Sequence, residues 1–164
     1  MGELRERRYQ WREPSEGWRK LGKVSGMDYL RDEMNGVHPP PPICVAMGFG
    51  LSELAPGRLV YAGAPGGDHG NVMGTAQGGW VASILDAAMS SVVHSLLPAG
   101  PTYSTLELKV NYVRPVRIDG GRLRAIGTSV HDGRRIGTAE GRLIDEADRL
   151  LAHGSVTCLI VQPE

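Results

Sequence analysis

The sequence predicts an α+β domain in which an antiparallel sheet wraps around one long buried helix. Three observations support this fold class. The stretch over 77–97 is apolar on nearly every face, as a buried helix is. Segments on both sides of it have the apolar–polar alternation and the turn residues of β-strands. One helix and one antiparallel sheet can bury each other only if the sheet curves around the helix.

The chain has 164 residues and a formal net charge of zero, which is enough for one domain with a substantial core. We expect an N-terminal arm over 1–42, with a short helix and a proline spacer, followed by the folded domain over 43–164. Charge neutrality argues against nucleic acid or an anionic membrane as a partner. Cys44 and Cys158 form no C-x-x-C motif, so neither a zinc site nor a redox pair is predicted.

The sequence indicates a soluble cytoplasmic protein. The first 23 residues are mixed in charge and lack the apolar segment of a signal peptide. The apolar run over 80–97 is the one candidate for a membrane span. It is short for a span and contains an acid, four serines and a histidine. We therefore expect no membrane partner.

Before the long helix, the sequence predicts a loosely held start and one short helix. Residues 1–24 carry Trp11 and Trp18 as their large anchors, which could dock on the domain or on a second subunit. A Ser-Gly-Met-Asp sequence similar to a capping box begins a helix over 25–36. The four prolines over 39–42 end this region as a stiff spacer.

The remaining elements alternate between strands and turns. We expect one helical turn over 43–47, and we expect Asp132-Gly133 to form a two-residue hairpin turn. A second turn follows at 145–148. The predicted strands cover 49–54, 59–64, 106–112, 123–130, 135–144 and 150–161.

Two glycines occupy the predicted first turn of the long helix. Glycine there costs roughly 0.5–1 kcal/mol relative to alanine, so Gly78 and Gly79 need a reason. One reason is close approach of a ligand to free N–H groups at a helix N-terminus, which suits a developing oxyanion. The other is tight packing against a strand. The preceding loop over 65–74 lacks the Gly-Lys-Ser/Thr of a phosphate-binding loop.

Asp86 is the one acid in the apolar helix. An isolated buried carboxylate costs several kcal/mol, so Asp86 is either catalytic or bonded to a Ser or Thr side chain. Gly78 and Asp86 are eight residues apart, about 12 Å along a helix. One carbonyl group cannot touch both within a subunit. If they act together, they meet across a two-fold dimer whose helices run in opposite directions.

The motif Asn71-x-x-Gly74-Thr75-x-Gln77-Gly78-Gly79, followed by Leu85-Asp86, resembles the PaaI-like hotdog-fold acyl-CoA thioesterases. The segment Thr105–Pro115 is similar to the family's strand after the helix. Leu150–Gly154 is similar to its closing strand. The resemblance extends over about 45–161 and leaves the arm outside.

The resemblance implies hydrolysis of an acyl-CoA thioester to a free acid and coenzyme A. It makes Asp86 the general base or the nucleophile. It makes the N–H of Gly78, with that of Gly79, the group that polarises the carbonyl, helped by Asn71. Thr105 would assist the water, since a hydroxyl can donate to a carboxylate. Strand alternation, however, places Thr105 and Leu106 on opposite faces, so a bulge or the dimer seam has to bring Thr105 to the site.

Gln77 stands where the family usually has histidine. Glutamine forms hydrogen bonds but does not titrate near neutral pH. The alternative function is therefore a catalytically weakened hotdog domain that binds acyl-CoA without efficient hydrolysis. A hotdog dehydratase is less favoured because its histidine base is missing. A Ser-His-Asp hydrolase would need a Gly-x-Ser-x-Gly motif.

The resemblance also implies a binding region for coenzyme A. Gly133, Arg134 and Arg135 are expected to contact the pantetheine arm and phosphates, with solvated strand ends as the alternative. Trp80 is expected near an apolar or aromatic acyl group. Among the histidines, His69 is a weaker candidate for a substrate contact and His94 is expected on the helix's wetter side.

We expect no metal and no cofactor, since coenzyme A is part of the substrate. We expect the chain to form a homodimer or a dimer of dimers.

Overall fold

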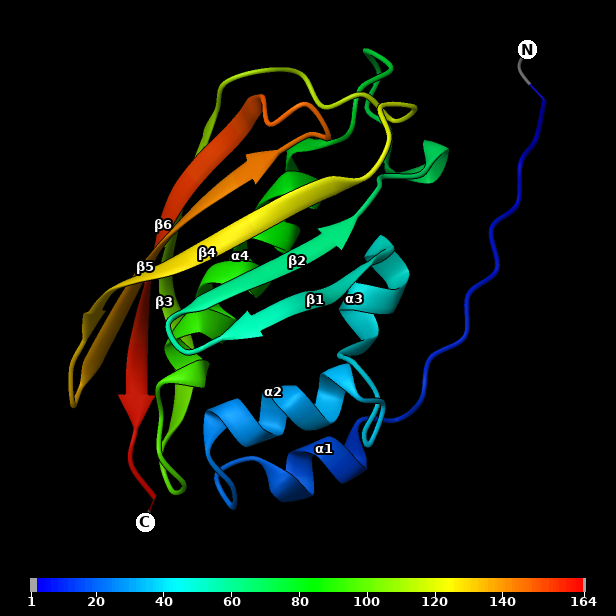
Figure 1. Ribbon diagram of the computed structural model, residues 1–164. Coiled ribbons are helices and arrows are strands. Elements are labelled where there is room, and N and C mark those ends of the chain that lie inside the picture. The colour runs from blue at the N-terminus through cyan, green and yellow to red at the C-terminus, as the bar shows by residue number, and fades with distance from the viewer. Residues whose placement is uncertain (1–2, 164) are drawn as a thin grey trace.

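The computed structural model describes residues 3–163, apart from the side chain of Glu16, as an antiparallel six-stranded sheet curved around a long helix, α4 (Gly78–Ser95) (Figure 1). The spatial order of the strands is β1-β2-β4-β5-β6-β3. Their bounds are β1 Phe49–Ala55, β2 Arg58–Gly63, β3 Thr102–Tyr112, β4 Leu123–Asp132, β5 Ile136–Ile144 and β6 Leu150–Val161. The predicted fold class is confirmed.

The helix α4 lies very close to the middle of the sheet because glycines face it. Gly127 of β4 is paired with Gly141 of β5. A Cβ on Gly127 would lie 2.6 Å from the carbonyl oxygen of Ala88, and one on Gly141 would lie 2.7 Å from Cγ of Met89. The absence of side chains at these positions therefore sets the distance between helix and sheet. The apolar residues of α4 fill the core around this contact, and Ile84, Leu85, Ala88, Met89 and Val92 have no exposed area.

Strand β3 forms an edge of the sheet and contains a bulge. It pairs with β6, and among residues 3–163 no strand covers its other side. The register shifts between Thr105 and Glu107, so Leu106 is the extra residue. Leu106 is 59% exposed on this edge. A long edge strand with an exposed apolar side chain is a template for pairing with another chain.

Three short helices precede the sheet, namely α1 (Ser15–Lys20), α2 (Gly26–Met34) and α3 (Pro42–Met47). The sequence predicts α2 and α3 correctly. Ser25 caps α2, since its hydroxyl accepts from the N–H of Asp28 at 3.2 Å. The sequence does not predict α1, which has six residues and no side-chain cap. The helix α2 packs against the end of α4, where the N–H of Gly26 donates to Leu97.

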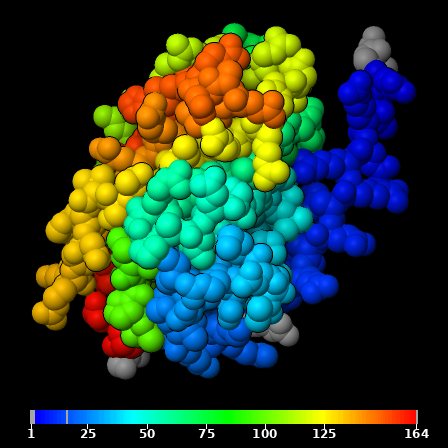
Figure 2. Space-filling view, in the orientation of Figure 1, coloured from blue at the N-terminus to red at the C-terminus, as the bar shows by residue number. Residues whose placement is uncertain are grey.

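Residues 3–13 form neither helix nor strand and are exposed along the side of the molecule (Figures 1 and 2). Arg7 attaches this segment to the domain through Asp68 at 2.5 Å. Trp11 is 57% exposed and Trp18 is 61% exposed, so neither is buried against the domain within this chain.

Two local expectations are wrong. His94 is 4% exposed rather than on a wet side, because α2 and β3 cover it with the rings of Tyr29 and Tyr103. Burial lowers the pKa of His94 to about 4. The β4–β5 turn consists of Arg134-Arg135 rather than Asp132-Gly133, since the N–H of Gly133 donates to the carbonyl of Ile136. A bulge between Ser129 and His131 in β4 moves the turn along the chain.

Within the described part of the chain, no helix combines the length and the apolar character needed to cross a membrane.

Candidate active site

Asp86 lies halfway along α4, next to β3. It is partly exposed, in contrast to its neighbour Leu85, which has no exposed area. The hydroxyl of Thr105 donates to Oδ1 of Asp86 at 3.4 Å, a long and therefore weak hydrogen bond. Burial raises the pKa of Asp86, and the bond from Thr105 opposes this effect. A partly exposed carboxylate with a raised pKa, beside the edge strand of the sheet, is suited to proton transfer.

The bulge in β3 explains how Thr105 reaches Asp86. Without it, alternation would separate the Thr105 side chain from the residues of the same strand that pack on the helix. The extra residue, Leu106, takes up one position, and Thr105 then contacts the acid. The conflict found in the sequence is therefore resolved within one chain.

The N-terminus of α4 presents two backbone donors. Gln77 is the N-cap, but its side chain is exposed and makes no capping hydrogen bond. Among residues 3–163, the N–H groups of Gly78 and Gly79 donate to no backbone acceptor, as expected in a helix's first turn. A Cβ on Gly79 would meet nothing within 4 Å. The two N–H groups at this end of the helix are therefore free to donate to an electronegative atom of a ligand.

Asn71 shapes the loop before α4. Its Nδ2 donates to the hydroxyl of Thr75 at 2.9 Å, and its Oδ1 accepts from the N–H groups of Met73 at 2.9 Å and Thr75 at 3.2 Å. These bonds close a tight turn, in which Gly74 has a φ of 76°. The Asn71 amide thus holds the loop in this chain.

His69 also has a structural position. Its Nδ1 accepts from the N–H of Gly66 at 2.9 Å, and its Nε2 lies 3.2 Å from the carbonyl oxygen of Ala46 and 2.9 Å from Nη1 of Arg7. The imidazole joins the 3₁₀ turn η1 (Gly67–His69) to α3. Both of its nitrogens are engaged by groups of this chain, and its contact with a substrate stays a prediction.

Trp80 is a core residue in this chain. It is 2% exposed, its ring packs edge-on against Phe49, and its indole N–H donates to the carbonyl of Met47 at 2.8 Å. The apolar residues that are open near the helix start are instead Val72 and Met73, at 105% and 82% exposure.

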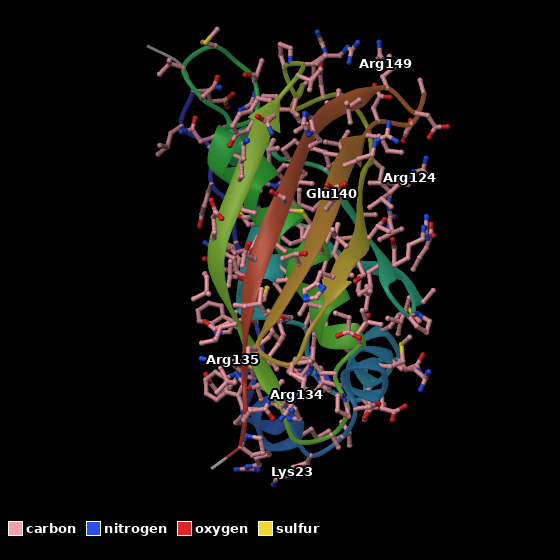
Figure 3. The ribbon with its side chains drawn as sticks, turned by 90° about the vertical axis from the view of Figure 1, so that its left-hand side faces the viewer. Lys23, Arg124, Arg134, Arg135, Glu140 and Arg149 are labelled. Carbon is pink, nitrogen blue, oxygen red and sulfur yellow. The ribbon has the colours of Figure 1, made fainter. Side chains whose placement is uncertain are left out.

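The structure separates the two expected halves of the site. Arg134 and Arg135 lie at the tip of the β4–β5 hairpin (Figure 3), near the C-terminal end of α4, where Gly137 faces Val93. Gly78 lies at the other end of this helix, whose 18 residues are about 27 Å long. One chain therefore does not bring Gly133–Arg135 together with its own Gly78.

Sequence reasoning missed two residues that border the site. Tyr112 donates its hydroxyl proton to the carbonyl of Gly78 at 3.0 Å. Cys158 of β6 is paired with Thr105, has no exposed area, and has a pKa raised by burial. Both lie on strands that the sequence predicts, but nothing in a strand pattern identifies a partner distant along the chain.

Comparison with known proteins agrees with this fold. The thioesterase superfamily model matches residues 73–152, which include α4 and the edge strand. A protein of Halobacterium salinarum, named as an esterase, is 35% identical over 83 residues, or 49% of this chain. The match spans only about half of that relative, 53% of its length.

Two solved structures from Thermus thermophilus match almost over their full length. The TT0310 protein is 30% identical, with a TM-score of 0.67 over 74% of this chain and 98% of its own. A mutant of the phenylacetic acid degradation protein PaaI is 29% identical, with a TM-score of 0.66 over 73% and 98%. The chain thus belongs to the thioesterase superfamily, as a hotdog-fold protein of the PaaI-like type.

Proposed function

We propose that this protein hydrolyses acyl-CoA thioesters, with each active site shared between two copies of the chain. Superfamily membership supports thioester hydrolysis. A structural neighbour from Streptococcus mutans UA159, 21% identical with a TM-score of 0.64, was solved with acetyl-CoA bound. This makes acyl-CoA the substrate class to test first.

The observation that carries the proposal is the placement of Asp86 beside an uncovered edge strand. Thr105 reaches Asp86 from β3, whose other side is unpaired among residues 3–163. Asp86 is about 12 Å along α4 from the donors at Gly78. A two-fold axis beside β3 would set two helices antiparallel, so that Gly78 of one copy approaches Asp86 of the other.

The same symmetry explains the position of Arg134 and Arg135. Each hairpin lies at the C-terminal end of its own α4, which is the end that a partner's helix N-terminus would approach. The two guanidinium groups would then face the phosphates of a coenzyme A bound at the partner's Gly78. Such a dimer brings together all the groups that one chain keeps apart.

The reaction then needs two kinds of group. Asp86 takes a proton from water as the water oxygen attacks the thioester carbon, or it attacks directly and forms a mixed anhydride that water opens. The N–H of Gly78 stabilises the negative oxygen of the tetrahedral intermediate. The C–S bond breaks, and coenzyme A leaves as the thiolate and takes up a proton. Thr105 orients the carboxylate or the water.

Gln77 does not obstruct this scheme. Its exposed side chain makes no capping bond, so the helix N–H groups are positioned without it. In the alternative function, the same site binds acyl-CoA, but the rate of hydrolysis is low.

Release of free thiol from a panel of aryl and aliphatic acyl-CoAs tests the proposal. We expect turnover by the wild type and a loss of at least about 100-fold in Asp86→Asn, which keeps size and polarity but cannot act as a base. Asp119→Asn, an exposed acid paired with Arg117, is the matched control and should keep full activity. Equal rates for the wild type and Asp86→Asn across the panel would refute the enzyme function.

A further inference from the structure

The first turn of α4 is held by a tyrosine from the edge strand. Gln77 provides no side-chain cap, and the turn is fixed by backbone bonds from Gln77 to His69 and from Trp80 to Gln77, at 2.8 and 2.9 Å. Two hydroxyl groups also donate to carbonyl oxygens of this turn: that of Ser83 to Gly79 at 2.8 Å, from within the helix, and that of Tyr112 to Gly78 at 3.0 Å, from the edge strand. Tyr112 is the last residue of β3 and is 57% exposed. It therefore connects the edge strand to the helix start.

The carbonyl that Tyr112 contacts belongs to the same peptide group as the N–H of Gly79. A hydrogen bond to a carbonyl oxygen withdraws electron density from the peptide and makes its N–H a stronger donor. This N–H has no backbone acceptor among residues 3–163, and the space beside Gly79 is open. Tyr112 thus acts on a donor that a ligand can reach.

The two glycines have different roles in this arrangement. A Cβ on Gly78 would lie 3.1 Å from the Tyr112 hydroxyl oxygen and 3.3 Å from its ring carbon Cζ. A Cβ on Gly79 would meet nothing within 4 Å. A Cβ on Gly78 would therefore crowd the tyrosine, which would have to shift by a few tenths of an ångström, whereas Gly79 leaves room for a substrate. This pairing accounts for the cost of two successive glycines in a first helical turn.

We infer that Tyr112 is a positioning residue for the oxyanion-binding end of the site: its hydroxyl orients the Gly78–Gly79 peptide and strengthens the Gly79 N–H as a donor to the substrate's carbonyl oxygen. The expected effect of Tyr112 on turnover rests on the proposed function. The expected effect of Tyr112 on the Gly79 amide does not depend on that function.

Tyr112→Phe removes one oxygen and keeps the ring. We expect kcat to fall about fivefold with KM changed less than twofold, since a bond that matters in the transition state is weakened. Tyr61→Phe is the matched control, because it removes another hydroxyl contact, 3.1 Å from Ser91, in the core. That control should lower the unfolding temperature and leave kcat unchanged. Equal kcat in Tyr112→Phe and the wild type would overturn the inference.

Binding of two inert acyl-CoA analogues separates positioning from general structural support. In one, a methylene replaces the sulfur and the carbonyl is kept; in the other, a thioether, a methylene replaces the carbonyl. The ketone carries the carbonyl in its ground-state form, so Tyr112→Phe should weaken its binding by up to about twofold, in line with KM, and should leave binding of the thioether unchanged. Equal weakening of both would show a merely structural role and overturn the inference.

Two further measurements do not depend on turnover. The amide proton resonance of Gly79 should move upfield in Tyr112→Phe, while that of the remote Gly36 stays fixed. Gly78→Ala should cost less activity or stability in the Tyr112→Phe background than in the wild type, because the oxygen at 3.1 Å is gone. An unmoved Gly79 resonance overturns the inference even if no thioester is hydrolysed. Absent hydrolysis with a moved resonance refutes the function and keeps the positioning role.

Discussion

At the scale of single residues, the partial burial of Asp86 is unfavourable for its charge, and the same burial raises its pKa, as a general base requires. Among the residues that the structure describes, its carboxylate has one weak partner, Thr105. A fully satisfied acid would be a poor base, because its proton affinity would fall. In the proposed mechanism, the single long bond from Thr105 leaves the carboxylate of Asp86 able to take up a proton.

Thr105→Val should move the acidic limb of the pH profile of kcat/KM to higher pH. Asp86 acts when it is ionised, so activity rises as pH increases through its pKa. The Thr105 bond lowers that pKa, and its removal raises it. The loss of activity should therefore be largest at acidic pH and shrink as pH rises. Thr128→Val, on the exposed face of β4, should leave the profile in place, and an unshifted limb in Thr105→Val would contradict the assigned contact.

At the scale of elements, the distance between α4 and the sheet is set by glycines on β4 and β5. Gly127 faces the backbone of Ala88, which cannot move aside without shifting the helix. The helix position in turn fixes where Asp86 meets β3 and where Gly78 meets Tyr112. Close packing in the middle of the sheet therefore maintains the geometry at both ends of the site.

Gly127→Ala should destabilise the fold by about 2–3 kcal/mol, because the new Cβ would overlap a helix carbonyl oxygen. Gly50→Ala in β1 is the control, since a Cβ there would meet nothing within 4 Å, and its effect should stay within about 0.5 kcal/mol. Urea unfolding measures both. Equal stability of the two variants would show that the helix is not held by this contact.

At the scale of the whole molecule, the proposed site is complete only if two copies combine. The donors at Gly78 and the hairpin at Arg134 lie at opposite ends of one helix. The edge of β3, which no strand covers among residues 3–163, is the surface where a second copy could bind and bring its Gly78 close to this chain's Arg134.

Mixing two inactive variants tests the shared site. In a dimer of Asp86→Asn with Gly78→Val, one site carries both changes and the other carries neither. Random exchange of subunits should therefore restore about a quarter of wild-type activity, since half of the dimers are mixed and each has one intact site of two. Thiol release after co-refolding measures this. No recovery, despite mixed dimers seen by native mass spectrometry, would place the site within one chain.

Much of the fold follows from local pattern. Alternation and turn residues locate the strands, because one face of each lies on the core. The α1 helix escapes prediction because it is too short and uncapped for a periodic signal. The sequence leaves the bulge at Leu106 as one of two alternatives, because pairing with β6, rather than composition, decides between them. The burial of His94 escapes because α2, distant along the chain, covers it.

The sequence by itself determined the wrapped-helix fold, the acid in its helix and the glycines at its start, since each follows from periodicity, helix rise or the cost of burying a charge. It also raised the conflict between Thr105 and strand alternation. Only the tertiary structure decided that a bulge resolves this conflict, that Trp80 and His69 serve the core and the loop, and that Tyr112 reaches Gly78. These contacts join residues far apart along the chain, and their geometry depends on register and on the packing of glycines, which no local pattern encodes.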